Sequence, residues 1–355
     1  MWETMTNSDK KRGLLPPLKP KSMLWISVIS VALYPWILAA FHWAISINGF
    51  DLQTPTKIDG STVLAALILL AAFIVPLINL SMASQPNDAA LETDIRSRRF
   101  ALLAVAAPTL YVFFGVVTYM AGVTIPDPWL WTPAWLVLGY WLSTRGQLVA
   151  QPKSTAMSAK LRVAHGIVGS VTALFLLFHI VNHLVGLFGP EAHAAFMELG
   201  RSIYRSPVIE PILVAMMLFQ IVSGLRLLWG WSESNIDGYR VFQLASGIFM
   251  AIFILGHMNS VFIFARTYLG IPTDWAFAAG LPTGLINDPW NIRLLPHYAL
   301  GVFFSLAHLF SGLRVVMLAH QVKLATANRI WWCGILLSTL TAVAIISALV
   351  GVRID

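Results

Sequence analysis

Residues 162–183 read RVAHGIVGSVTALFLLFHIVNH, and the pattern returns at residues 240–258, which read RVFQLASGIFMAIFILGHM. Aligned without a gap, the two stretches coincide at Arg162/Arg240, Val163/Val241, Gly169/Gly247, Ala173/Ala251, Phe175/Phe253, Leu177/Leu255 and His179/His257. Each stretch is followed by a second apolar segment, and both of these segments contain Ser-Gly-Leu-Arg, at residues 223–226 and 311–314. A self-match at a fixed spacing is typical of a duplicated structural unit, so the sequence predicts a two-helix unit that occurs twice.

The composition places this unit in a membrane. Of the 355 residues, 57% are hydrophobic and only 11% are charged. A soluble domain of this length cannot bury so much apolar surface, so we expect an all-α integral membrane protein. The formal net charge of +7 follows the loops and not one face, which argues against a nucleic-acid partner. The only cysteine, Cys333, excludes an intrachain disulfide, a cysteine-ligated zinc or iron–sulphur site and a covalent haem attachment motif.

Apolar runs of spanning length predict about nine transmembrane helices, with eight as the alternative because the fourth run is short and contains Pro133. The nine runs are residues 24–47, 62–82, 100–122, 129–143, 163–188, 207–229, 241–268, 296–319 and 330–350. They divide the chain into a polar cytoplasmic tail (1–23), a four-span region of unknown role (24–150) and a five-span region that carries the repeat (151–355).

Loop charge predicts the orientation. With nine spans and the N-terminus in the cytoplasm, seventeen Lys and Arg residues fall on the inner side and six on the outer side. This asymmetry is the positive-inside pattern of a protein of the inner (cytoplasmic) membrane, and it places the C-terminus outside.

The same orientation predicts two polar layers inside the bilayer. His179 and His257 each lie seventeen residues beyond an inner-edge arginine, about 25 Å at ~1.5 Å per residue, so they share one level in the outer half. Gln220 and His308 each precede an inner-edge arginine by six residues, about 9 Å, so they share a level in the inner half.

Two histidines at one level in hydrocarbon are typical ligands of haem b, since imidazoles from two helices bind the iron from opposite faces. Gly224 and Gly312 lie one turn beyond the inner positions, where bare backbone could accept a flat macrocycle. A histidine in a membrane can also serve only as an interhelical hydrogen-bond partner, and glycines can serve only close packing. For a repeated and depth-matched pair we favour haem ligation.

Residues 240–268 and 296–317 resemble the first two helices of the cytochrome b membrane anchor of succinate:quinone oxidoreductases, the succinate dehydrogenase and fumarate reductase family. One helix of that family carries a small hydroxyl residue and glycine, then Gly-His-Met, which here are Ser246-Gly247 and Gly256-His257-Met258. The next helix carries His, Gly, an apolar residue and Arg, which here are His308, Gly312, Leu313 and Arg314. With the duplication, the resemblance covers about residues 160–320.

The resemblance implies that His179 and His257 ligate an outer haem b and that His308 ligates an inner one. The chain departs from the family at Gln220, which stands where the second inner histidine is expected. The inner site could therefore be empty, five-coordinate or completed by His165. The short loop between the two copies also leaves no room for the extra helix of the diheme members, and the four N-terminal spans have no counterpart.

Other polar residues allow several interpretations. His183, one turn from His179, could be a propionate neighbour, an alternative ligand or a packed polar residue. Arg162, His165 and Arg314 gather near the inner edge, where a quinone head group or haem propionates need donors, although snorkelling arginines are common there. Two further histidines are interpreted as structural and interfacial, respectively: His42 and His297.

These features predict a membrane-anchor haem b subunit that passes electrons between a membrane quinone and a peripheral dehydrogenase or reductase. The chain has no GxGxxG motif and no cysteine cluster, so flavin and iron–sulphur chemistry would belong to partner subunits. Two alternatives remain: another haem b quinol oxidoreductase anchor, and a non-redox transporter or scaffold built on a duplicated helical unit.

Overall fold

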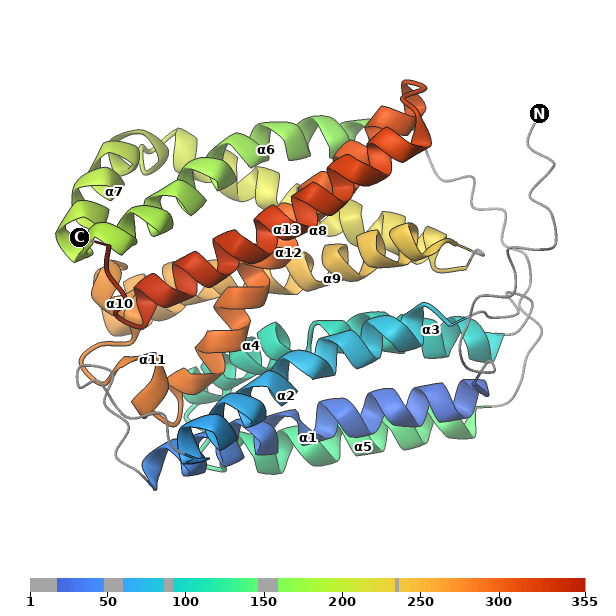
Figure 1. Cartoon of the computed structure of the whole chain (residues 1–355), viewed down its shortest axis with the longest axis horizontal. Coiled ribbons are helices and arrows are strands. Elements are labelled where there is room, and N and C mark those ends of the chain that lie inside the picture. Colours follow the sequence, from blue (N-terminus) through green and yellow to red (C-terminus); the bar gives the residue numbers. More distant parts are fainter. Residues whose placement is uncertain (1–17, 48–59, 86–91, 146–158, 234–235, 355) are drawn as a thin grey trace.

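The computed structural model describes residues 18–47, 60–85, 92–145, 159–233 and 236–354, and this part of the chain consists of helices joined by short turns and loops, without strands (Figure 1). Most of the expected tail, residues 1–23, lies outside the described residues, and the first helix already begins at Pro20. The N-terminal helices are α1 (Pro20–Ser46), α2 (Gly60–Ala83), α3 (Glu92–Val105), α4 (Ala107–Met120) and α5 (Asp127–Thr144).

The second half contains the repeat. Its long helices are α6 (Ala159–Val185), α8 (Ile209–Trp231), α9 (Gly238–Met258), α12 (Leu294–Ala319) and α13 (Leu324–Leu349). Shorter elements connect them: η1 (Gly186–Phe188), α7 (Pro190–Tyr204), the π-helical η2 (Asn259–Leu269), α10 (Trp275–Ala279), α11 (Gly284–Asn287) and η3 (Asn291–Arg293). The two copies of the repeat are therefore the α6–α8 pair and the α9–α12 pair.

Seven of the described helices are long and apolar enough to cross a membrane, and the bent pair α3–α4 makes an eighth if it counts as one span. The expectation of about nine spans is thus not confirmed. The expected span that is missing from these helices is α5. Its 18 residues include five Trp and Tyr side chains, two prolines and Asp127, so it is not apolar enough. It runs beside α1 (Figure 1), where Trp131 donates a 2.9 Å hydrogen bond from Nε1 to the Val31 carbonyl.

A sharp bend separates α3 from α4. The two helices meet at an angle of 68° around Ala106. Pro108 follows at the second position of α4, and its ring and missing N–H cannot continue the hydrogen-bonding of α3. The bend lets α4 pack against α9, where the Phe113 side chain lies 3.3 Å from the place of a Cβ on Gly256.

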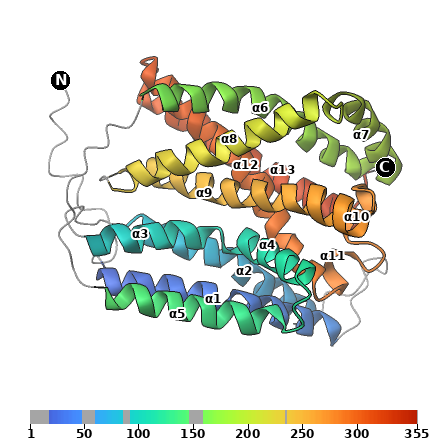
Figure 2. The ribbon, with the colours of Figure 1, turned by 180° about the vertical axis from the view of Figure 1, so that it is seen from behind.

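The two repeat copies differ in how deeply they are buried. Figures 1 and 2 both place α9 between the α6–α8 pair and the N-terminal helices. Only 17% of the most apolar stretch of α6 and 11% of that of α8 are buried inside the protein, against 28% for the α9 segment and 33% for the α12 segment. The N-terminal helices therefore support the second copy, while the first copy presents much more of its surface to the surroundings.

At the end of the bundle predicted to face outward, α7 folds back across the end of α6. Its buried residues His193, Met197 and Gly200 fall at helical spacing on one face. The C-terminal segment ends at the same place, where the Ile354 N–H donates to the Leu187 carbonyl at 2.9 Å. The C-terminal segment and the outer ends of α6 and α7 therefore lie together.

Candidate functional site

The two repeated histidines face each other. His179 on α6 and His257 at the end of α9 have ring centroids 5.9 Å apart, with an angle of 65° between the ring planes. His179 and His257 lie equally far from Arg162 and Arg240 on helices that run in the same direction, and this predicts that the two rings meet. The predicted proximity of the two rings is confirmed. The π-helical turn of η2 begins at Asn259, two residues beyond His257, and such turns are frequent at functional sites.

The separation of the rings fits one iron between them. A metal–nitrogen bond of ~2.0–2.1 Å on each side, plus the radius of each ring, places two ligating imidazole centroids about 6 Å apart. Both rings keep accessible surface although they lie within the helix bundle. Across the described ranges, no group of three or more His, Cys, Asp or Glu residues could hold a bare metal ion. A haem needs only two protein ligands, because the porphyrin supplies the other four.

Each of these histidines is backed by a phenylalanine one turn earlier. The Phe175 ring lies parallel to His179 at 5.8 Å, and the Phe253 ring lies parallel to His257 at 5.8 Å. Phe175 and Phe253 are themselves equivalent positions of the repeat, so both copies build the same stacked pair. Gly301 on α12 makes room for it, since a Cβ there would overlap the Phe253 ring. The stacking fixes the planes in which the two imidazoles can lie.

Three further histidines extend this outer layer. The ring of His183 lies 4.8 Å from that of His179, and His193 on α7 lies 5.4 Å from His183. His297 packs against Phe253 with a centroid distance of 4.8 Å and is only 4% exposed, so it is buried in the protein, and its position at the membrane interface stays a prediction. His193 was missed because it belongs to no repeated motif and reaches the layer only when α7 folds back.

The inner layer holds two imidazoles in the same manner. Nδ1 of His308 on α12 lies 2.9 Å from Oγ of Ser246 on α9, and Nδ1 of His165 on α6 lies 2.7 Å from Oγ of Ser223 on α8. Each serine hydroxyl donates to a carbonyl of its own helix, so its oxygen is left to accept from Nδ1–H. The Nε2 atom of each ring is then the unprotonated nitrogen, which is the form that binds a metal.

Gln220 does not join these two rings. Its Nε2 donates a 3.0 Å hydrogen bond to the main-chain carbonyl of His165, and its side chain lies beside Gly169. His165 and His308 are close enough to interact electrostatically. The inner layer therefore holds one serine-bound imidazole from each repeat copy, His165 and His308, while Gln220 binds the backbone of the first copy.

The glycines of the inner layer differ in their surroundings. A Cβ on Gly224 would stand 3.3 Å from the His165 ring, and a Cβ on Gly247 would stand 3.3 Å from the His308 ring. Gly224 thus faces an imidazole and not open space. Beside Gly312 there is nothing within 4 Å of such a Cβ. Of the two glycines proposed to accept a macrocycle, only Gly312 has free space next to it.

Three arginines gather at the end of the repeat that is predicted to face inward. The positive charges of Arg162 and Arg314 both act on Arg240, and the carboxylate of Asp237 opposes them. Arg314 is only 8% exposed; its Nε donates to Asn328 at 2.8 Å and its guanidinium covers the ring of Tyr239 at 3.8 Å. Such a concentration of positive charge in a low-dielectric setting favours an anionic group such as a propionate.

No protein-family model matches the chain, no curated protein matches it, and no solved structure matches it. The geometry of the two histidine layers is therefore the ground for any functional proposal.

Proposed function

We propose that the chain is a membrane-anchor haem b subunit that transfers electrons between a membrane quinone and a peripheral flavin and iron–sulphur dehydrogenase or reductase of the succinate or fumarate type. The observation that carries the proposal is the 5.9 Å approach of His179 and His257 from equivalent positions of a duplicated helix pair. A hydrogen-bonding role alone would not require two equivalent, phenylalanine-backed imidazoles with the spacing of a bis-imidazole iron site.

In this proposal His179 and His257 hold the outer haem by one ring nitrogen each. Phe175 and Phe253 fix the ring planes, so little reorganisation accompanies a change of charge at the iron. The surrounding apolar helices exclude water. When bound, the haem supplies one-electron transfer, which the side chains of this chain cannot perform themselves.

A second haem belongs to the inner layer, with His308 and His165 as its candidate ligands. Arg162 and Arg314 lie where propionates or a quinone head group would find cationic donors. Gln220, Gly224 and His183 then have supporting roles: Gln220 and Gly224 position the His165 backbone and ring, and His183 packs beside the outer pair.

The proposed location is the inner membrane, with the N-terminus in the cytoplasm and the C-terminus outside. Flavoprotein and iron–sulphur partner subunits would bind the inner side, because the basic loops concentrate there and present a charge that an acidic partner surface can recognise. Electrons would then enter near His308.

An absorption spectrum of the purified protein tests the proposal. We expect a dithionite-reduced spectrum of low-spin haem b in the unchanged protein, and its loss or strong reduction in His179→Ala and His257→Ala. His320→Ala is the matched control, because His320 is exposed at the end of α12 and contacts neither layer. A protein that inserts normally but contains no haem would overturn the proposal and favour a transporter or scaffold.

A further inference from the structure

A cavity of about 450 Å³ lies where the N-terminal helices meet the segment before α12. Its wall comes from α1, from α4, from the turn between α4 and α5, and from residues 289–293. It is separate from both histidine layers, and it involves the four-span region for which the sequence predicts no role.

The polar side of this cavity is built around an ion pair. Nη1 of Arg293 contacts Oδ2 of Asp127 at 2.6 Å, and the Thr118 hydroxyl donates to Oδ1 of the same carboxylate at 2.9 Å. Nε of Arg293 donates to the Trp290 carbonyl at 3.0 Å. Within the described residues Nη2 has no hydrogen-bond partner, so it remains available as a donor. The pair leaves the lining neutral overall, which disfavours a charged ligand.

The other sides are aromatic and apolar. The rings of Tyr111 and Trp290 each lie 4.5 Å from the guanidinium carbon of Arg293. Gly115 makes this arrangement possible, because a Cβ there would overlap Nη1 of Arg293. His42, from the end of α1, lines the opposite wall, with its Nε2 3.3 Å from the Asn287 carbonyl. The cavity lining thus combines aromatic side chains with one guanidinium nitrogen, Nη2 of Arg293, that has no partner among the described residues.

We infer that this cavity binds the head group of a membrane quinone. A quinone is a neutral, planar ring whose carbonyl oxygens accept hydrogen bonds, and the volume lies within the ~300–1,000 Å³ typical of small-molecule sites. The unpartnered Nη2 of Arg293 suits a carbonyl oxygen, and the partly exposed ring of Trp290 suits the quinone ring, while Tyr111, only 3% exposed, supports the guanidinium from behind. The inference rests on the proposed function for the identity of its ligand class, but it assigns the ligand to the outer end of the four-span region and not to the inner arginines.

The outer histidine layer begins one helical turn beyond Arg293, which lines the cavity. His297 follows Arg293 by four residues, about 6 Å along the helix at ~1.5 Å per residue. The His297 ring packs on Phe253 at 4.8 Å, and Phe253 stacks on His257 at 5.8 Å. A short series of packed rings therefore leads from His297, one turn beyond Arg293, to the proposed haem ligand His257.

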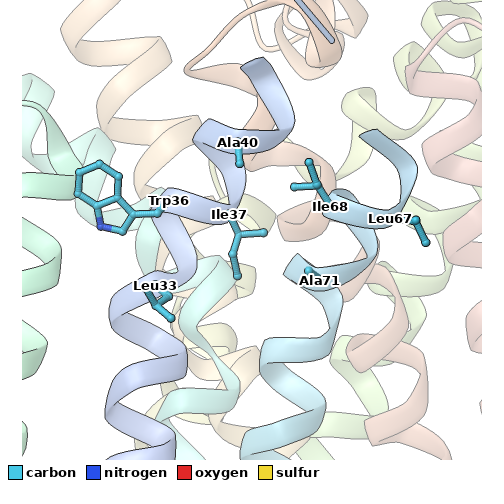
Figure 3. Close-up of a pocket in the computed structure, with 7 residues that line it drawn as sticks. All are labelled: Leu33, Trp36, Ile37, Ala40, Leu67, Ile68 and Ala71. Carbon is cyan, nitrogen blue, oxygen red and sulfur yellow. The ribbon is translucent and has the colours of Figure 1, made fainter. Parts of the chain in front are cut away.

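A second hollow in the structure lacks the hydrogen-bond donor that a quinone site needs. A groove of about 420 Å³ lies between α1 and α2, and Figure 3 shows the side chains that line it, among them Leu33, Ile37 and Ala40. Its one polar group, Nε1 of Trp36, already donates to Thr132 at 2.9 Å. The groove offers no donor to a carbonyl oxygen, so it suits an acyl chain and not a quinone head group.

Adjacent alanines on α1 give a matched pair of variants. Ala39 lines the cavity and Ala40 lines the groove, so Ala39→Trp fills the first and Ala40→Trp fills the second. The probes are azido derivatives of a short-tail benzoquinone and a short-tail naphthoquinone, each photolabelled onto the full-length protein in detergent. We expect labelled peptides from residues 111–128 or 289–293. Labelling should fall about tenfold in Ala39→Trp and stay unchanged in Ala40→Trp.

The possible outcomes separate the inference from the proposed function. The inference would be overturned by quinone label on the groove or on the inner arginines, or by full labelling of Ala39→Trp. A haem spectrum in the same sample would still support the anchor function. Retention of phospholipid in the cavity, with no quinone label, would also overturn it. If Ala39→Trp fails to fold, the position of the label in the unchanged protein decides. Absence of haem would refute the anchor function whatever the label shows.

Discussion

His308 on α12 and Ser246 on α9 meet across the second repeat copy, with Nδ1 and Oγ 2.9 Å apart. In the first copy the same kind of contact joins His165 and Ser223, but there the histidine is on the first helix and the serine on the second. The duplicated unit has therefore kept a serine-held imidazole in each copy while moving it from one helix to the other. Gln220 stands at the position aligned with His308, and the imidazole of the first copy comes from its other helix.

The serine contact predicts the effect of Ser246→Ala. A hydrogen-bond partner on the second ring nitrogen of a metal-binding histidine typically raises the metal affinity 10–100-fold. In Ser246→Ala we therefore expect the inner haem to bind about tenfold more weakly and the outer haem to be unaffected. Haem titration of the apoprotein, followed by the reduced spectrum, measures this. Ser311→Ala is the control, because the described hydrogen bonds of the Ser311 hydroxyl go to Trp331 and to the Ala307 carbonyl and not to a histidine. Equal inner-haem affinity in both variants would contradict the assignment of His308.

The free space beside Gly312 allows a second prediction about the inner haem. Gly312→Phe removes no contact and fills only this space, so the helix should insert normally. If a porphyrin lies against Gly312, the variant loses the inner haem. Gly166→Phe is the matched control, since Gly166 also has nothing within 4 Å but is exposed near the start of α6. Haem content is measured per polypeptide after purification. Full occupancy in Gly312→Phe would place the macrocycle elsewhere.

The repeat made the outer pair predictable from sequence. Because His179 and His257 lie equally far from Arg162 and Arg240 on helices of one direction, simple helix geometry brings them to one level. Their stacking on Phe175 and Phe253 follows from the same spacing. For the inner layer the alignment places Gln220 opposite His308 and leaves His165 as one of three alternatives, because the two histidines occupy positions that do not correspond.

Features that depend on packing outside the repeat were also not predictable. The bend at Ala106 interrupts an apolar stretch that reads as one span, and α5 reads as a span only if its tryptophans are counted as apolar. His193 comes from a segment between two spans. His297 follows a proline at a helix start, a typical interfacial context, and only the fold places it against Phe253.

The ion pair of the cavity predicts a stability difference between two acid-to-amide substitutions. The side chains of Arg293 and Asp127 are 8% and 12% exposed, so Asp127→Asn leaves a guanidinium that is nearly buried without a counter-charge. We expect a loss of about 3 kcal/mol, the lower end for breaking a buried pair. Glu210→Gln breaks the more exposed pair with Arg266, 28% and 29% exposed, and should cost less than about 1 kcal/mol. Thermal midpoints in detergent compare the two, and equal losses would refute the role of burial.

His193 predicts how stability depends on pH. It lies on α7, outside the spanning helices, where burial and the charge of Arg201 lower its pKa to about 4 against an opposing effect of Asp274. His183 is the other titratable group in ring contact with it. Below pH ~6.5 the histidine is protonated in the unfolded chain but stays neutral in the folded protein. Stability therefore falls as the pH drops from ~6.5 to ~4 and levels off below that. The total loss is up to about 3 kcal/mol. The thermal midpoint at pH 4.5 relative to pH 7 should therefore drop less in His193→Gln than in the unchanged protein, whereas a substitution of the exposed His320 should leave the drop as it was. An identical acid loss in His193→Gln would mean that another group carries it.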